Sequence, residues 1–341
     1  MSRRFLLALL LVAGLAMPGA AYASQAQDPL RAALSWLQSQ QQKDGGFSTG
    51  FSPGSDPSAT ADAVVAAVAG KVDPASWKNS GHSPIDFLAS TVAAGGVKGP
   101  GQAAKVALAV KAAGLDPRSF GGEDLIAAVV AGYDSGKGLF GTGPFDSAIA
   151  ILALTAVKEP LPPGAIEGLL ATRLKDGSFS FNGDTTPGAG DSNTTAAVVQ
   201  ALVAAGARDQ LAPSIDYFRA SQNPDAGWTY QKPSQFGEAT DANSTALVIQ
   251  ALVAAGQDLK TWKNPRQALL ALQAPSGGFL FNASTPGENL LATVQAIPAL
   301  AATEPSAPVN TSPVTGTVVV AALVALVVVL AAAALYARRR G

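Results

Sequence analysis

The sequence contains no cysteine and only one histidine, His82, among its 341 residues. Without cysteine the chain has no disulfides, no thiolate metal sites, no cysteine nucleophile and no internal thioester. A single histidine excludes a histidine-rich metal centre and leaves a serine hydrolase only one candidate base. His82 lies between Gly81 and Ser83, a loop context in which solvation is the usual state of a histidine. We therefore expect neither a metal nor a resident cofactor.

Charge is also scarce in this chain. Charged residues make up 14% of the sequence, and the mean hydropathy is +0.23. All 24 acidic side chains lie between the two apolar ends of the chain, and the same region contains 18 basic side chains. A nucleic-acid surface needs clustered Lys and Arg to neutralise phosphates, so we expect no nucleic-acid partner.

The first 23 residues have the pattern of a secretory signal peptide. Arg3 and Arg4 supply the charged region, and residues 5–17 form the apolar core. Residues 21–23, Ala-Tyr-Ala, offer small side chains at the cleavage positions. An uncleaved anchor is the alternative, but the apolar core is short for a membrane span. The mature chain is therefore expected to begin near Ser24.

The other end of the chain predicts a membrane anchor. Residues 317–337 carry no charge and would be about 30 Å long as a helix, which matches the hydrocarbon core of a bilayer. The basic tail 338–341 follows, and the positive-inside rule places it in the cytoplasm with the ectodomain outside. Residues 304–316 form a stalk rich in Pro, Ser, Thr and Ala. The stalk ends in Ser-Pro-Val-Thr-Gly, which resembles a sortase signal, but Ser312 replaces the usual leucine and a plain anchor is favoured.

Between these ends the sequence repeats itself. Residues 191–206 match residues 241–256 at 12 of 16 positions. Around them a unit recurs that consists of a helical run, a glycine-aromatic turn, a polar loop and a second helical run starting at Asp, Asn, Ser or Thr. At the turn, an offset of 50 residues equates Gly177 with Gly227 and Gly277. Six units are recognised, at 30–70, 84–114, 124–157, 165–206, 214–256 and 265–302.

The two helical runs of a unit differ in character. The second run, for example 194–206 or 244–256, is apolar almost all round, which is typical of a helix buried on most sides. The first run is more amphipathic. One unit cannot bury its apolar face alone, so the array must stack or close. We predict an all-α fold over 24–303, an α/α toroid of six helical hairpins with alternating inner and outer helices; an open solenoid is the alternative.

The turn carries a recognisable motif. Phe218-x3-Gln222-x4-Gly227-Trp228 resembles the QW motif of squalene and oxidosqualene cyclases, and 41–47 and 273–279 are related versions. The wider α/α-toroid group also contains protein prenyltransferase β subunits and the helical domain of transcobalamin-like carriers. The resemblance implies a toroid in which the motif residues tie outer helices to neighbouring turns. These structural residues are Gln222, Gly227, Trp228, Gly277 and Phe279.

The residues that catalysis in this group would need are missing. Squalene cyclases use an Asp-x-Asp-Asp tetrad to protonate the substrate, whereas Asp184, Asp191 and Asp241 are isolated here. Asp191 and Asp241 have the pattern of helix N-caps, and a helix N-terminus lowers the pKa of a carboxyl, the wrong direction for a general acid. Prenyltransferases hold zinc with Asp, Cys and His, and this chain has no Cys.

Polar residues recur at the starts of the apolar helices and suggest a ligand site. If these helices run parallel, their N-termini meet at one mouth of the ring, beside aromatic residues of the following loops. Polar groups beside aromatic ones around a concavity suit a small organic ligand. Gln200, Gln250 and Gln295 recur within the helices, where an inter-helix hydrogen bond or a ligand would satisfy them. The candidate ligand-binding residues are Asp191, Asn193, Thr195, Asp241, Asn243, Thr245, Trp228, Tyr230 and Phe281.

Helix capping alone would also explain the recurrence of Asp191, Asn193, Asp241 and Asn243. We expect a membrane-anchored, non-catalytic module on a bacterial cell surface that binds a small apolar or corrinoid ligand, or a protein. The resemblance to transcobalamin-like carriers makes cobalamin the corrinoid to test. Two alternatives stay open: a divergent terpene cyclase- or prenyltransferase-like enzyme with an unrecognised acid, and a purely structural surface domain.

Overall fold

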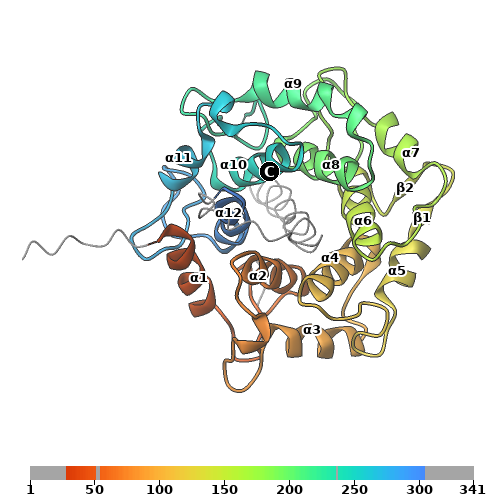
Figure 1. The fold of residues 1–341 in the computed structure, drawn as a ribbon, viewed down its shortest axis with the longest axis vertical. Coiled ribbons are helices and arrows are strands. Elements are labelled where there is room, and N and C mark those ends of the chain that lie inside the picture. Colours follow the sequence, from red (N-terminus) through yellow and green to blue (C-terminus); the bar gives the residue numbers. More distant parts are fainter. Residues whose placement is uncertain (1–27, 51–53, 236, 304–341) are drawn as a thin grey trace, which may run out of the picture.

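The computed structural model describes residues 28–50, 54–235 and 237–303. Within these residues, twelve α-helices alternate between the outer and the inner layer of a ring, and successive hairpins follow its circumference (Figure 1). No helix of this described part is long and apolar enough to cross a bilayer. The signal peptide, stalk, transmembrane helix and basic tail lie outside the described residues and stay predictions.

Each hairpin contributes one helix to each layer. The outer helices are α1 (Pro29–Ser39), α3 (Pro84–Ala93), α5 (Leu125–Ala131), α7 (Ala165–Ala171), α9 (Ala212–Ser221) and α11 (Pro265–Leu270). The inner helices are α2 (Pro57–Ala69), α4 (Gly99–Ala112), α6 (Pro144–Ala156), α8 (Ser192–Ala204), α10 (Ala242–Ala254) and α12 (Leu290–Ala302). The turn after α5 forms a short antiparallel pair, β1 (Tyr133–Asp134) and β2 (Leu139–Phe140), that the sequence analysis did not predict.

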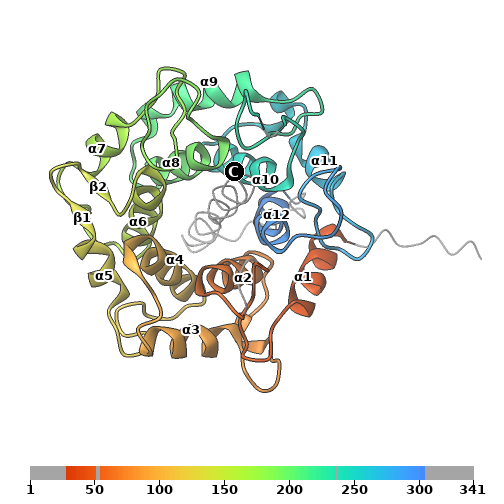
Figure 2. The ribbon, with the colours of Figure 1, turned by 180° about the vertical axis from the view of Figure 1, so that it is seen from behind.

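The ring closes on itself. Each inner helix packs against the next, and α12 packs against α2, so the last hairpin lies beside the first (Figure 2). At this seam the Gln273 side chain donates a hydrogen bond to the Pro29 carbonyl at the start of α1, over 2.8 Å. Gly277 lies so close to α1 that a Cβ on it would be 2.3 Å from the Ala32 carbonyl oxygen. The predicted closed toroid is confirmed, and the open solenoid is wrong.

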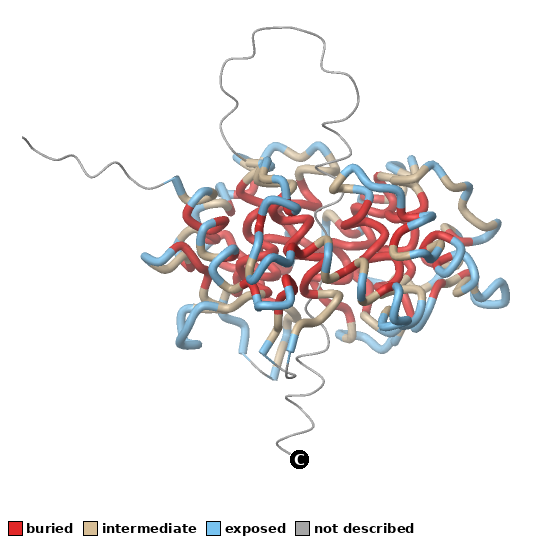
Figure 3. The backbone as a smooth tube through the Cα atoms, turned by 90° about the horizontal axis from the view of Figure 1, so that it is seen from below, coloured by how far each residue is buried: buried red, intermediate tan, exposed pale blue. Residues whose placement is uncertain are grey.

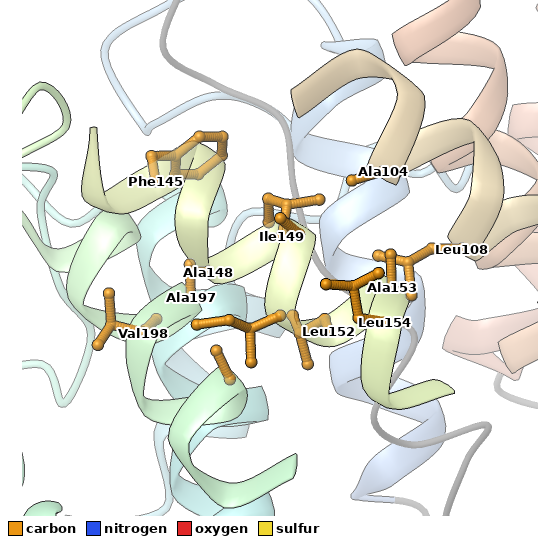
Figure 4. Close-up of a cluster of buried hydrophobic side chains, with 14 of the residues drawn as sticks. Ala104, Leu108, Phe145, Ala148, Ile149, Leu152, Ala153, Leu154, Ala197 and Val198 are labelled. Carbon is orange, nitrogen blue, oxygen red and sulfur yellow. The ribbon is translucent and has the colours of Figure 1, made fainter. Parts of the chain in front are cut away.

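The core is a buried band that runs around the ring, with exposed residues above and below it (Figure 3). The inner helices supply most of it through Ala, Val, Leu and Ile. In Figure 4, Ile149 and Leu152 of α6 lie between Leu108 of α4 and Ala197 of α8. The many alanines let neighbouring helices approach closely, and each large buried aliphatic side chain contributes about 1.5–3 kcal/mol.

Four inner helices begin at a side chain that caps them. Each of these side chains accepts a hydrogen bond from the backbone N–H three residues further on, over 2.7–2.9 Å. A cap of this kind stabilises a helix by about 1 kcal/mol because it satisfies a backbone donor that has no partner within the helix. The four caps are Asp56, Asp191, Asp241 and Asn289.

In five inner helices, a hydroxyl group one turn after the helix start binds the turn of the same hairpin. This bond fixes how the helix is rotated about its own axis. Thr195 Oγ1 accepts a hydrogen bond from the Phe179 backbone N–H over 3.0 Å and donates one to the Asp191 carbonyl over 2.6 Å. We call such a hydroxyl residue an anchor; it faces outward, toward the turn of its own hairpin. The equivalent pairs, at 2.9–3.0 Å, are Phe47 with Thr60, Phe140 with Ser147, Trp228 with Thr245 and Phe279 with Thr293.

The anchors correct the repeat register at the turn. They equate Phe179 with Trp228 and Phe279, so the spacing is 49 and then 51 residues instead of a constant 50. The predicted equivalence of Gly227 with Gly177 and Gly277 is therefore wrong by one position. The left-handed turn position lies two residues before each aromatic, with φ of 89° at Gly177, 76° at Ala226 and 103° at Gly277.

The motif glutamines join each turn to the next outer helix. Gln222 Nε2 donates to the Ala226 carbonyl of its own turn over 3.0 Å and to the Trp262 carbonyl, just before α11, over 2.9 Å. Gln273 makes the same pair of contacts, with Gly277 over 2.9 Å and with α1 across the seam. The outer layer is therefore held together by side-chain amides as well as by packing.

Candidate functional site

Three of the predicted ligand-binding residues lie in the wall between the two layers. Thr195 and Thr245 are anchors whose hydroxyls face the turns. Trp228 is fully buried, its Nε1 donates to the Phe218 carbonyl over 2.8 Å, and its ring centre is 6.1 Å from that of Trp262. These side chains are committed to contacts within the wall. Thr195 and Trp228 also touch the helix caps, since the Thr195 hydroxyl donates to the Asp191 carbonyl over 2.6 Å and the Trp228 carbonyl accepts from the Asp241 N–H over 2.9 Å.

Asn193 and Asn243 face the opposite way. Each precedes its anchor by two residues, about 200° around the helix, which directs it toward the axis of the ring. We call this side of the inner helices the inner face. Only 2% of Asn193 and 1% of Asn243 is exposed, and neither the Oδ1 nor the Nδ2 atom of either has a hydrogen-bond partner. Because an unpartnered buried polar group costs about 1–3 kcal/mol, such a pair suggests a functional site.

Gln200 and Gln250 share the inner face with these asparagines. Each follows its anchor by five residues, which places it about 140° from the anchor around the helix axis and therefore on the side of the asparagines. Gln200 Nε2 makes a long 3.4 Å bond to the Ala196 carbonyl of its own helix, and Gln250 Nε2 donates to the Gln295 carbonyl of α12 over 3.1 Å. Both Oε1 atoms lack a partner. The inter-helix bond considered from the sequence thus exists for Gln250 but not for Gln200.

Asp191 and Asp241 cap α8 and α10 and are almost completely buried. The Oδ1 atoms accept hydrogen bonds from the Thr194 and Ser244 N–H groups, both over 2.7 Å. Burial nevertheless raises the pKa of each carboxyl from 3.8 to about 7. The expected lowering of the pKa is wrong, because desolvation disfavours the charged form more than the hydrogen bonds at the helix N-terminus favour it.

Tyr230 lies between the two carboxyl groups. Its backbone interacts with the Asp241 carboxyl and its side chain approaches the Asp191 carboxyl, and each contact lowers the pKa of the acid concerned. These contacts offset only part of the effect of burial, and Asp191 Oδ2 keeps no hydrogen-bond partner. The structure therefore brings three of the predicted residues, Asp191, Asp241 and Tyr230, into one cluster.

The loop residues Tyr230 and Phe281 also tie neighbouring hairpins together. The Tyr230 carbonyl accepts a hydrogen bond from the Ser192 N–H at the start of α8, over 2.8 Å. The Phe281 carbonyl does the same for the Ala242 N–H at the start of α10, also over 2.8 Å. Each loop thus holds the first turn of the preceding inner helix, which fixes the position of the polar residues there.

Tyr217 of α9 was missed by sequence reasoning. It is 5% exposed, its hydroxyl has no partner, and burial raises its pKa. The hydroxyl lies near Ser192 at the start of α8 and near Asp191, without a hydrogen bond of normal geometry. An aromatic residue in an outer helix is typical of packing, so no pattern in the sequence pointed to its place next to the carboxyl cluster.

A buried ion pair occupies another part of the inner layer. Lys105 Nζ of α4 is 3.4 Å from Asp62 Oδ2 of α2, and the two side chains are 8% and 6% exposed. Burial raises the pKa of Asp62 and lowers that of Lys105, while each charge partly compensates the other. The available signal was the single acid within the apolar α2 and a lysine in the middle of the adjacent apolar α4. Within the described ranges, no three acidic or histidine side chains gather as a metal site requires.

Comparisons with known proteins bear on the fold. No protein-family model and no curated protein matches the sequence of this chain. A crystal structure of a protein from Actinoplanes matches with a TM-score of 0.58 and 14% identity, over 80% of this chain and 98% of that one. The structure of an unsaturated glucuronyl hydrolase specific for heparin matches with a TM-score of 0.59 and 13% identity, over 80% of this chain and 95% of the hydrolase. The structure of the type II terpene cyclase MstE from Scytonema matches with a TM-score of 0.56 and 14% identity, over 80% of this chain and 96% of the cyclase. The chain therefore has the α/α-toroid fold of terpenoid cyclase-like proteins.

Proposed function

We propose that this chain is a ligand-binding toroid whose site lies at the first turns of α8 and α10. The observation that carries this proposal is the pair Asn193 and Asn243, two buried carboxamides at equivalent places in adjacent helices without hydrogen-bond partners. A ligand that pairs with them would offset the cost of burying them. Asp191, with its unpartnered Oδ2, and Tyr230 lie at the same helix starts.

The two ends of the sequence support a location for this function. A signal peptide over 1–23 and a transmembrane helix over 317–337 would hold the toroid outside a bacterial membrane, with the basic tail in the cytoplasm. The ligand would then be an extracellular small molecule, apolar or corrinoid, or a segment of a surface protein. The resemblance to transcobalamin-like carriers makes cobalamin the first corrinoid to test.

Native mass spectrometry of the full-length chain in detergent micelles tests this function, on the protein as purified and after incubation with cobalamin. We expect a stoichiometric mass increment in the wild type that is lost in the double variant Asn193→Ala/Asn243→Ala. The matched control is Gln257→Ala, which removes a half-buried carboxamide from the loop after α10 and should keep the increment.

Two outcomes would contradict the proposal. One is a bare mass in both samples, which would remove cobalamin and any tightly co-purifying small molecule as the ligand. The other is an increment that the double variant retains, which would place the ligand elsewhere. Melting temperatures of all variants by circular dichroism show whether a lost increment reflects a lost fold.

A second candidate function, an enzyme that donates a proton from Asp191 or Asp241, is favoured by the raised pKa of these acids. A carboxyl with a pKa of about 7 is still partly protonated at neutral pH, as a general acid must be. The named solved neighbours, a glucuronyl hydrolase and a terpene cyclase, are enzymes. This candidate is the divergent cyclase-like enzyme that the sequence left open.

Turnover of squalene by the full-length chain tests the second candidate. Asp191→Asn is the informative variant, because asparagine is an equally good N-cap but cannot donate the acid proton. Product formation that disappears in Asp191→Asn, at an unchanged melting temperature, would support acid catalysis. Absence of product in the wild type would count against cyclisation of this substrate.

A further inference from the structure

Four carboxamides form a quadrilateral on the inner face of α8 and α10. Gln200 follows Asn193 by seven residues, and Gln250 follows Asn243 by seven, so the members of each pair are about 10 Å apart along one side of their helix. α8 packs directly against α10, which places the two pairs about 8–10 Å apart. The anchors give both helices the same register. We call these four residues the amide quartet.

The quartet has both donors and acceptors without partners. The amide nitrogens and oxygens of Asn193 and Asn243 are unpartnered, and so are the Oε1 atoms of Gln200 and Gln250. All four side chains are at least nine-tenths buried. A matching ligand must therefore offer hydrogen-bond donors to the oxygens and acceptors to the asparagine nitrogens.

The rest of the inner face limits the ligand further. The side chains of Asp62 and Lys105 are paired with each other, so they offer no free countercharge. On α6, the places equivalent to Asn193 and Gln200 are occupied by Phe145 and Leu152, both buried and apolar. The inner face therefore combines uncharged hydrogen-bonding groups on α8 and α10 with hydrocarbon on the neighbouring α6.

We propose, on the basis of the function proposed above, that the amide quartet binds an uncharged ligand carrying hydroxyl or amide groups about 10 Å apart, the span of a neutral disaccharide. Hydroxyl and amide groups both donate and accept, so they can pair with every free atom of the quartet. A hydrocarbon ligand would leave these atoms unpaired, and an ionic ligand would find no opposite charge among them.

Isothermal titration calorimetry of the full-length chain in detergent micelles tests this proposal. The probes are N,N′-diacetylchitobiose (hydroxyl and amide groups), maltose (hydroxyl groups), cobalamin (amide groups) and squalene (neither). We expect saturable binding of at least one of the first three. Binding of maltose would show that hydroxyl groups pair with the quartet, and binding of cobalamin would show that amide groups do. Gln200→Met, which keeps the shape but removes the polar atoms, should weaken this binding about tenfold.

The same variant separates ligand binding from a structural role. Because Gln200 Oε1 is buried without a partner, Gln200→Met should raise the melting temperature while it weakens binding. A structural role would lower the melting temperature. Gln257→Met, outside the quartet, is the matched control and should leave affinity unchanged.

Three results would overturn the proposal: binding of squalene alone, binding of none of the first three probes, or wild-type affinity in Gln200→Met. Squalene binding that is lost in Asn193→Ala/Asn243→Ala would overturn the ligand class but retain the site of the proposed function. Squalene binding that this double variant retains would overturn both.

Discussion

The inner faces of α8 and α6 occupy equivalent places in adjacent hairpins, yet they present opposite chemistry. Two residues before the anchor, α8 has Asn193 and α6 has Phe145; five residues after it, α8 has Gln200 and α6 has Leu152. Both helices are held by the same hydrogen bond from the turn to the anchor hydroxyl. The repeat thus keeps the hydrogen bond that builds the ring and lets the residues of the inner face vary.

The largest effect is expected from giving α6 the residue that α8 has. Leu152 is 2% exposed, so Leu152→Gln removes buried hydrocarbon and adds an amide without a partner. The free energy of unfolding should fall by about 4 kcal/mol, measured by urea denaturation. Leu115→Gln, at a site that is 41% exposed, should change it by less than about 0.5 kcal/mol. A similar small change in both variants would show that the inner face of α6 tolerates a buried amide as the inner face of α8 does.

The next effect concerns pH and the caps of α8 and α10. Because burial raises the pKa of Asp191 and Asp241 from 3.8 to about 7, the folded chain holds protons that the unfolded chain releases. Stability should therefore decrease as the pH rises from about 4 to 8, by on the order of 3 kcal/mol per carboxyl. Asp191→Asn keeps a cap and should reduce this slope and be more stable than the wild type at pH 8.

Urea denaturation at pH 5 and pH 8 measures this slope. Asp216→Asn, an exposed substitution on α9, should leave it unchanged. An Asp191→Asn slope equal to that of the wild type would mean that the carboxyl is ionised in the folded chain at both pH values.

A smaller and equal effect is expected from the anchors, the feature that α8 and α6 share. Thr195→Val leaves the buried Phe179 N–H without an acceptor, and Ser147→Ala does the same to the Phe140 N–H. Each change should lower the free energy of unfolding by about 2 kcal/mol. Thermal denaturation of the two variants provides the comparison. Values differing by more than about 1.5 kcal/mol would show that the anchors are not equivalent.

Sequence reasoning located the candidate site only in part. The recurrence of Asp191, Asn193 and their partners in α10 drew attention to the starts of α8 and α10, because a repeated polar residue on an apolar background is visible without coordinates. It could not separate Thr195 from Asn193, which are two residues apart but lie on opposite sides of α8. It also missed Tyr217, whose contact with the start of α8 depends on packing between layers.

The local patterns of the sequence determined the twelve helices, their pairing into six hairpins and the caps that start them. Capping hydrogen bonds and helical periodicity act over a few residues, so they can be recognised without coordinates. The tertiary structure decided that the ring closes through α12 and α2, that Ala226 and not Gly227 occupies the left-handed turn position, and that the capping carboxyls are harder to ionise. Closure, register between layers and desolvation all depend on neighbours that are distant along the chain, and only the folded ring brings these together.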